Sequence, residues 1–179
     1  MRLNYTYIIN QLYSTLIENP KLNPADSDNR YINQLLKQRF IPGAPFPAVL
    51  LSVSNKREAQ MAMAYVPAVD LVIAAKIYCS LPESNPCQAV LDELGVSAIT
   101  TGELVEKENY LIVSEIEEWL RADNTIVGQQ RRILNSQGST EINLKPIMMP
   151  VVVFDMMDIG TRKLSVTTIQ LALNQIRIL

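Results

Sequence analysis

The sequence predicts an α+β fold, in which a mainly antiparallel sheet has helices packed on one face. Three observations lead to this class. Apolar residues at helical spacing cover the N-terminus and residues 101–122, strict alternation covers 68–80, and apolar β-branched stretches dominate the end of the chain. The length of 179 residues fits one domain, 1–179, within which 27–67 is an insertion or excursion of uncertain structure.

The composition excludes several classes of protein. The chain is 48% hydrophobic and 19% charged with a net charge of −2, which disfavours the basic face that nucleic-acid binding needs. It contains no histidine, the commonest general base and metal ligand. No apolar run approaches the roughly 20 residues that span a bilayer, and the N-terminus lacks a signal-peptide pattern. We therefore expect no membrane partner and no sequence-specific nucleic-acid partner.

The N-terminal segment predicts two helices and a connector. The first covers residues 5–17 and ends at Asn19-Pro20, because proline disfavours the α conformation in the residue before it. A second, short helix is predicted after a cap at Asp26 or Ser27. Four residues would share one face of it: Ile32, Leu35, Leu36 and Arg39. Residues 41–47 then hold three prolines and a glycine, so they must be extended or turning.

Two strands are predicted in the next part of the chain. Residues 48–54 are apolar enough for the first strand, whereas 55–65 fit a mobile excursion better. Residues 68–80 alternate strictly between apolar and other side chains, which predicts a long strand with one buried face. Because its second face is only half polar, we expect that face to be covered too, with another subunit as one candidate.

Two further helices follow. Asn85-Pro86 has the residues of a helix start and Gly95 those of a helix end. Thr100 and Glu103 form a capping-box pattern, so the main helix is predicted over residues 101–122. Its buried face would carry five apolar residues, with the tryptophan largely buried: Ile112, Val113, Ile116, Trp119 and Leu120. Its exposed face is predicted to be acidic.

The remainder of the chain is predicted to be β-structure. Residues 131–135 and 140–144 flank the sequence SQGS and predict a hairpin. Residues 150–157 predict a strand, Asp158–Thr161 a turn, and 163–179 a long closing strand. The aliphatic alternation of this last strand changes phase at Asn174-Gln175, where a β-bulge would absorb the slip.

No residue pattern predicts catalysis, cofactor binding or metal binding. Cys87 would lie near a helix start, where the macrodipole lowers a thiol pKa, but no histidine is available to act as its base. A disulfide between Cys79 and Cys87 is not expected in a cytosolic chain. Glu115, Glu117 and Glu118 point in different directions on a helix, which favours a solvated acidic face over a metal site.

Six of the seven methionines occur in close pairs, one of which is Met156/Met157. Adjacent strand residues face opposite sides, so one member of such a pair lies outside a one-sided core. Flexible thioethers suit adaptable contact surfaces, and they also fill gaps in two-sided cores. Both interpretations remain open. For an oligomer interface we select five candidates: Met156, Met157, Ile159, Arg131 and Arg132.

One part of the sequence resembles a known family. A helix ends in LRADNTIVGQQRRI (residues 120–133), a hairpin and a valine-rich strand follow, and the chain closes with QLALNQIRIL (170–179). This order resembles the tail terminator, or tail-to-head joining, proteins of long-tailed bacteriophages. Asp123, Asn124 and Gly128 match the family's turn. The resemblance covers about two thirds of the chain and does not extend to residues 32–65.

The resemblance implies a structural virion protein without catalytic residues. It implies a homo-oligomeric ring, typically a hexamer, that caps the tail tube and joins it to the neck and head. Expected partners are the tail tube protein, a neck or head-completion protein and, for a contractile tail, the sheath protein. The expected location is the tail and neck of the virion, assembled in the host cytoplasm. Alternatives are another neck, tail-completion or baseplate component, or, in a different class, a small cytosolic adaptor or binding module.

Overall fold

The structure is a computed structural model that describes residues 5–37, 45–59, 68–121, 132–134, 141–143, 151–159 and 162–177. The elements follow one another in the order α1 (Tyr5–Ile17), η1 (Pro20–Leu22), β1 (Gln34–Lys37), β2 (Ala48–Ala59), β3 (Ala68–Leu81), α2 (Gln88–Leu94), α3 (Gly102–Arg121), β4 (Arg132–Leu134), β5 (Glu141–Asn143), β6 (Val151–Ile159) and β7 (Arg162–Arg177). Among these elements, no helix is both long enough and apolar enough to cross a membrane.

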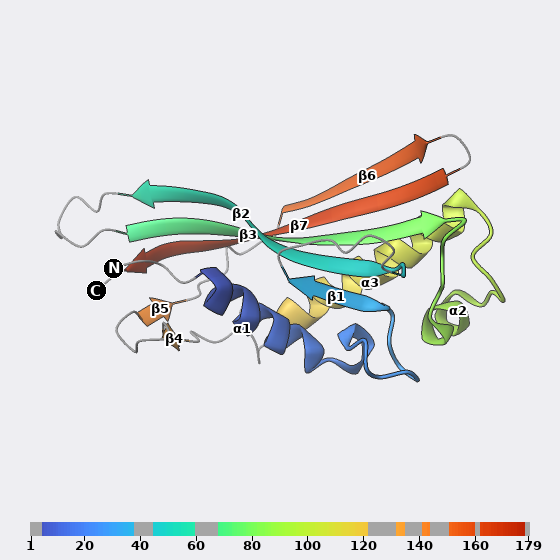
Figure 1. Ribbon diagram of the computed structural model, residues 1–179, viewed down its shortest axis with the longest axis horizontal. Helices are drawn as coiled ribbons and strands as arrows, with labels where there is room; N and C mark the ends of the chain where they lie inside the picture. The colour runs from blue at the N-terminus through green and yellow to red at the C-terminus, as the bar shows by residue number, and fades with distance from the viewer. Residues whose placement is uncertain are drawn as a thin grey trace.

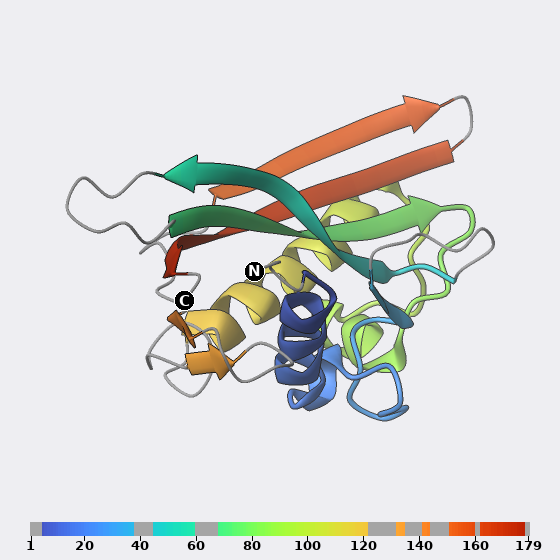
Figure 2. The ribbon, with the colours of Figure 1, turned by 60° about the vertical axis from the view of Figure 1, so that its left-hand side comes forward.

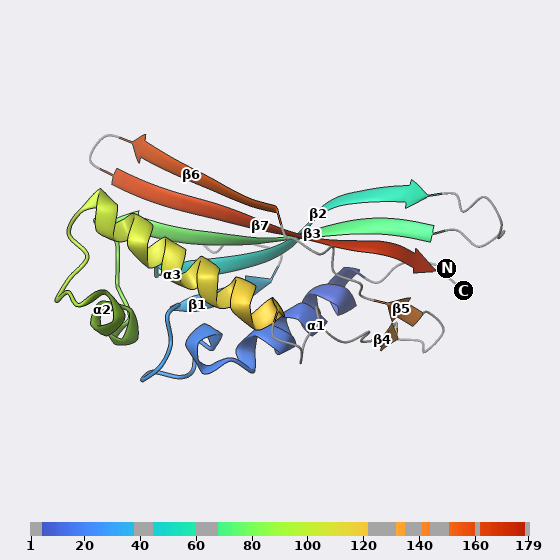
Figure 3. The ribbon, with the colours of Figure 1, turned by 180° about the vertical axis from the view of Figure 1, so that it is seen from behind.

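Five strands form one sheet in the order β1-β2-β3-β7-β6. All neighbours in it are antiparallel except β1 and β2, which are parallel. Figure 1 and Figure 3 show α1, α2 and α3 on the same face of this sheet, and Figure 2 shows the two layers from another side. The predicted α+β class, with helices on one face of a mainly antiparallel sheet, is confirmed.

The core lies between α3 and the middle of the sheet. Alternate residues of β3 face the helices and are buried: Leu71, Ile73, Ala75, Ile77 and Cys79. On α3 the predicted apolar face is buried at Ile112, Ile116 and Leu120. Each large aliphatic side chain of this kind contributes about 1.5–3 kcal/mol by leaving water. The alternation in residues 68–80 and the helical spacing in 101–122 therefore predicted both halves of the core.

Trp119 departs from the predicted core. It is only partly buried, and its indole Nε1 donates a hydrogen bond of 2.9 Å to the backbone oxygen of Thr15. The expectation of a largely buried tryptophan is met only in part: the side chain packs against the core, but it lies at the rim, where α3 meets α1. There it joins the two helices.

The second face of the sheet carries no helix or strand in the described chain. On β3 this face holds Ala74, which is buried, and Val72, Lys76 and Tyr78, which are half-buried by neighbouring strands. Coverage of this face by another subunit stays a prediction.

The predicted second helix is wrong. Residues 27–33 form turns, and Gln34–Lys37 form strand β1, which pairs in parallel with the start of β2. The backbone N–H of Asn33 donates to the oxygen of Pro47 at 2.9 Å and leads the chain into this pairing. Leu35 faces the helices and is buried, whereas Leu36 is half-buried. The residues that show apparent helical spacing therefore form a short strand, which pairs with β2 further along the chain.

Residues 27–67, set apart as an insertion or excursion of uncertain structure, contain β1 and all of β2. Strand β2 continues beyond the predicted 48–54 as far as Ala59, so the mobile excursion predicted over 55–65 is wrong for residues 55–59. A bulge between Val53 and Asn55 lets the polar stretch after it keep pairing with β3. Residues 60–67 lie outside the described part.

Both later helices were predicted with small boundary errors. Helix α2 begins at Gln88, two residues after the predicted start, so Cys87 is its N-cap and not a helical residue. Gly95 ends α2 with a φ of 66°, the left-handed conformation that favours glycine there. At α3 the backbone N–H of Leu104 donates to Thr101 Oγ1 at 3.3 Å, so Thr101 caps the helix and not Thr100.

The predicted C-terminal strands are confirmed, with one correction. Strands β4 and β5 pair antiparallel, as the hairpin prediction required. Strand β6 runs on to Ile159, so Asp158 and Ile159 are strand residues and not part of a turn. In β7, Asn174 and Gln175 together oppose the single residue Asp70, which places the predicted bulge correctly.

Candidate functional site

Strand β6 is an edge of the five-stranded sheet. Its nine residues, Val151–Ile159, pair with β7 on one side, and no described strand pairs with the other side. An unpaired edge presents backbone N–H and C=O groups that a further strand can bind. Figure 1 shows β6 beside β7 at the margin of the molecule, at the end of the sheet opposite β1.

Both faces of β6 carry exposed apolar side chains. The face turned away from the helices carries Val151, Val153 and Met157, whose side chains are 57%, 50% and 40% exposed. An edge strand with one solvated face normally alternates apolar and polar residues, and here Asp155 is the only charged residue among the four side chains described on this face. Strands that are apolar on both faces are typical of sheet interiors, which indicates that β6 becomes covered.

The helix-side face of β6 holds an exposed aromatic pair. Phe154, 53% exposed, contacts Tyr110 of α3, 45% exposed, with ring centroids 5.2 Å apart and ring planes at 84°. This edge-to-face geometry is favourable, yet both rings keep about half their surface in water. The pair extends the apolar surface of β6 onto α3, and large aromatic side chains are enriched in protein interfaces.

The structure separates the five residues selected from the sequence. Met156 and Met157 lie together on β6, where Met156 is half-buried on the helix side and Met157 is exposed on the other. Ile159 ends the same strand, and its side chain lies outside the described part. Arg132 begins β4 in a separate two-stranded sheet, and Arg131 lies outside the described residues. Figure 3 shows this small sheet well away from β6.

Four interface candidates were missed by sequence reasoning: Val151, Val153, Phe154 and Tyr110. The signal for the first three was present in the unbroken apolar run over residues 151–154, which cannot be one-sided in a strand. Tyr110 gave no signal, because its exposure depends on how α3 lies against β6.

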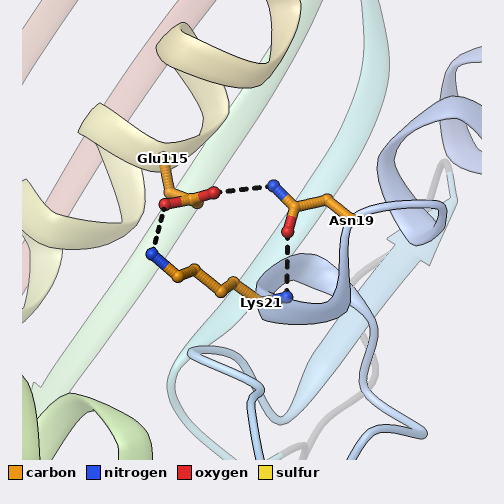
Figure 4. A network of polar contacts seen from close by, with 3 residues as sticks. All are labelled: Asn19, Lys21 and Glu115. Carbon is orange, nitrogen blue, oxygen red and sulfur yellow. Dashed lines mark hydrogen bonds and ion pairs between the residues drawn. The ribbon is translucent and has the colours of Figure 1, made fainter.

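Two acidic residues of α3, Glu108 and Glu115, depart from the solvated face that was predicted, whereas Glu103 and Glu118 are exposed. Glu115 is half-buried, and its carboxylate accepts hydrogen bonds from Asn19 Nδ2 at 2.7 Å and from Lys21 Nζ at 3.1 Å (Figure 4). Asn19 Oδ1 in turn accepts from the backbone N–H of Lys21 at 2.9 Å and caps η1. Hydrogen bonding to Tyr31 and Glu115 raises the pKa of Lys21. Glu115 therefore fixes the end of α1 and η1 to α3.

Glu108 lies in the core beneath α3. Its side chain is fully buried, and neither carboxylate oxygen has a hydrogen-bond partner of normal geometry among the described residues. Burial raises its pKa to about 7, while the nearby Cys79 thiol lowers it by a smaller amount. The next residue, Asn109, is fully satisfied by comparison: its Nδ2 donates to the oxygens of Ile77 and Ser165, and its Oδ1 accepts from the Thr167 hydroxyl.

Both cysteines are free thiols in buried positions. Desolvation raises the pKa of Cys79 far above its usual value and that of Cys87 to about 11. Cys87 Sγ lies 3.5 Å from Asn33 Oδ1. A thiol held in this way is a weak nucleophile, so the cap position of Cys87 does not activate it. In the described part of the chain, no three His, Cys, Asp or Glu residues are placed to bind a metal ion.

A cavity of about 400 Å³ lies between η1, the following turns and α2. Three of its seven lining residues are acidic and one is basic: Lys21, Asp28, Asn29, Tyr31, Ala89, Asp92 and Glu93. Lys21 forms an ion pair with Glu115, and its Nζ also lies 5.0 Å from the centre of the Tyr31 ring. The cavity therefore offers no free cation for an anionic ligand, and β6 is the better candidate for a functional surface.

Comparison with known proteins gives no family for this chain: no family model matches it, and no curated protein matches its sequence significantly.

Proposed function

We propose that the chain is a structural subunit of a long-tailed phage, and that it forms a ring which caps the tail tube and joins it to the neck. The proposal is supported by the family resemblance of the sequence and by one structural observation, the exposed apolar strand β6 at the edge of the sheet. A monomer that keeps Val151, Val153 and Met157 in water has an unfavourable surface, which association removes.

A ring requires that β6 contact a different surface of the next copy. If two β6 strands paired with each other about their centres, Asp155 would lie directly opposite its own counterpart, and like charges in that position are destabilising. Heterologous contacts close into rings, whereas self-complementary contacts stop at dimers. Asp155 thus favours the ring over a sheet-to-sheet dimer.

The proposed role is not enzymatic. The thiol closest to a helix start, Cys87, is buried and protonated at neutral pH, and Glu115 is held in a structural network. The proposed partners are further copies of the chain (five for a hexamer), the tail tube protein, a neck or head-completion protein and, in a contractile tail, the sheath protein. The proposed location is the virion, with assembly in the host cytoplasm.

The test compares wild type with Met157→Glu and with Ser114→Glu, which adds the same charge at an exposed position of α3. Sedimentation at micromolar concentration, alone and with tubes of the tail-tube protein from the same gene cluster, measures assembly. We expect Met157→Glu to weaken self-association or tube binding at least about tenfold, because a charge in a desolvated contact is costly. Melting curves should show equal monomer stability for the two variants.

Three results would contradict the proposal. Wild type could remain monomeric both alone and with tubes. Met157→Glu could assemble as well as Ser114→Glu. The gene cluster could contain no tail genes, which together with a tight monomer would favour the small adaptor or binding module.

A further inference from the structure

Glu108 is a buried acid without a charged partner, and the mechanism of assembly does not use it. Its side chain has no exposed surface, and neither carboxylate oxygen has a hydrogen-bond partner of normal geometry among the described groups; the nearby Cys79 thiol interacts with it only as a weak donor. An ionised carboxylate in this position is strongly unfavourable, whereas a protonated one is tolerated. The structure as folded is therefore suited to the neutral acid.

The groups around Glu108 cannot neutralise its charge. Among the described residues, β3 contributes the Cys79 thiol and the segment before α2 contributes the Cys87 thiol, and both interact with Glu108. Arg30 interacts with Cys87 from the loop before β1, and its guanidinium donates a hydrogen bond of 2.7 Å to the oxygen of Pro24. Strand β7 contributes Ser165 and Thr167, which bind Asn109 and do not ionise.

The elements around Glu108 differ greatly in how firmly they are held. Strand β3 is paired along both edges, with β2 and β7, and α3 has 20 residues packed on the sheet. Helix α2 has only seven residues, of which Val90 and Leu91 are buried, and it contacts α3. Short elements with few buried residues open at the lowest free energy. Figure 3 shows α2 at the margin of the molecule, beside the first half of α3.

We propose that Glu108 is a proton-controlled latch for α2: the protonated acid keeps residues 87–94 packed on α3, and its ionisation releases them and exposes the Cys87 thiol. Because burial raises the pKa of Glu108 to about 7 from the ordinary 4.5, the release develops as the pH rises through this interval and is complete above neutrality. The latch is independent of the proposed assembly through β6.

Hydrogen exchange of the full chain tests the latch. Wild type, Glu108→Gln and the control Glu118→Gln, which alters an exposed acid of the same helix, are compared between pH 5 and pH 8 after correction for intrinsic exchange rates. We expect the opening equilibrium of residues 88–94 to rise roughly 70-fold in wild type and in Glu118→Gln, as the pKa shift from 4.5 to about 7 requires. In Glu108→Gln it should change less than about twofold.

Alkylation by iodoacetamide provides the second readout. The ratio of wild-type to Glu108→Gln rates at each pH cancels the titration of the thiol itself, and this ratio should rise with pH for Cys87 and stay constant for Cys79. If Glu108→Gln does not fold, Glu108→Leu replaces it, since an apolar residue also removes the charge. The latch is wrong if protection in α2 does not respond to pH, or if β3 and Cys79 become exposed to the same extent as α2.

Discussion

At the scale of single residues, Trp119 shows how one side chain joins two helices. Its indole donates a hydrogen bond to the Thr15 oxygen while its ring packs against the core. Trp119→Phe keeps most of the packing and loses the hydrogen bond, so we expect it to lower the free energy of unfolding by about 1–2 kcal/mol. Urea denaturation followed by circular dichroism measures this. A loss as large as that of Ile116→Ala, about 2–5 kcal/mol at a fully buried position, would contradict the rim position.

Because Glu108 is buried, we expect the free energy of unfolding to decrease as the pH rises towards neutrality. Because its pKa is about 7 in the folded chain and near 4.5 when unfolded, its favourable contribution is complete below pH 4.5 and is lost as the pH rises to 7. The loss amounts to at most about 3 kcal/mol, since opening of α2 can relieve it. Denaturation midpoints of Glu108→Gln should therefore exceed those of wild type increasingly from pH 5 to pH 8. A constant difference would contradict the assignment.

The acidic face predicted for α3 does not include Glu108 and Glu115, and the reason differs between these two residues. Glu108 lies three residues after Val105 and four before Ile112, both buried, so helical spacing alone placed it on the apolar face. The spacing therefore indicated a buried position, although we predicted the acidic residues of this helix on its exposed face. Glu115 meets Asn19 and Lys21, more than 90 residues earlier in the chain, and no local pattern reports such a contact.

At the scale of elements, replacement of glycine by alanine should have opposite effects on stability at the end of α2 and at the start of α3. Gly95 has a φ of 66° and no atom within 4 Å of an added Cβ, so Gly95→Ala should cost about 1 kcal/mol from backbone strain alone. At Gly102, the first residue of α3, an added Cβ would meet only the Lys163 side chain at 3.7 Å, an ordinary contact. Gly102→Ala should be neutral or stabilise by up to about 1 kcal/mol. Thermal denaturation of both variants checks this pair, and equal effects would contradict it.

Strand β1 shows where element prediction failed. Apolar residues at positions 32, 35 and 36 satisfy helical spacing, but a four-residue strand cannot display enough alternation to compete with that pattern. Its pairing with β2 depends on tertiary contacts, among them the hydrogen bond from Tyr31 N–H to the Lys21 oxygen at 2.7 Å. The long strands β3 and β7 were predictable because 14 and 16 residues give the alternation room to appear.

At the scale of the whole molecule, the strand order predicts a gradient of protection against hydrogen exchange. Strand β3 is central and covered by α3, whereas β1 and β6 are edges. Amides of residues 71–79 should therefore exchange only through global unfolding, while those of β6 exchange at least about 100-fold faster in the monomer. Mass spectrometry at low protein concentration measures both. Slow exchange throughout β6 in a monomer would show that this edge is already covered.

The layer arrangement was predictable from the sequence, but the neighbours within the sheet were not. Helix α3 is amphipathic and β3 has one strongly apolar face, so the helices must pack on that face of the sheet, which determines the α+β class. Nothing in the apolar patterns states that β7 lies between β3 and β6, because the pairing residues of β3 and β7 are about a hundred positions apart. For the same reason the sequence placed Met156 and Arg132 in one interface, although they lie on different sheets.

The position of β7 also determines which strands can pair while the chain is still being synthesised. The β2–β3 hairpin and α3 can form early from neighbouring residues, but β3 keeps one open edge until residues 162–177 have been synthesised. Pairings between distant segments form late and slowly. A nascent chain halted before residue 162 therefore displays an apolar strand edge, which is a natural substrate for a chaperone and a starting point for aggregation.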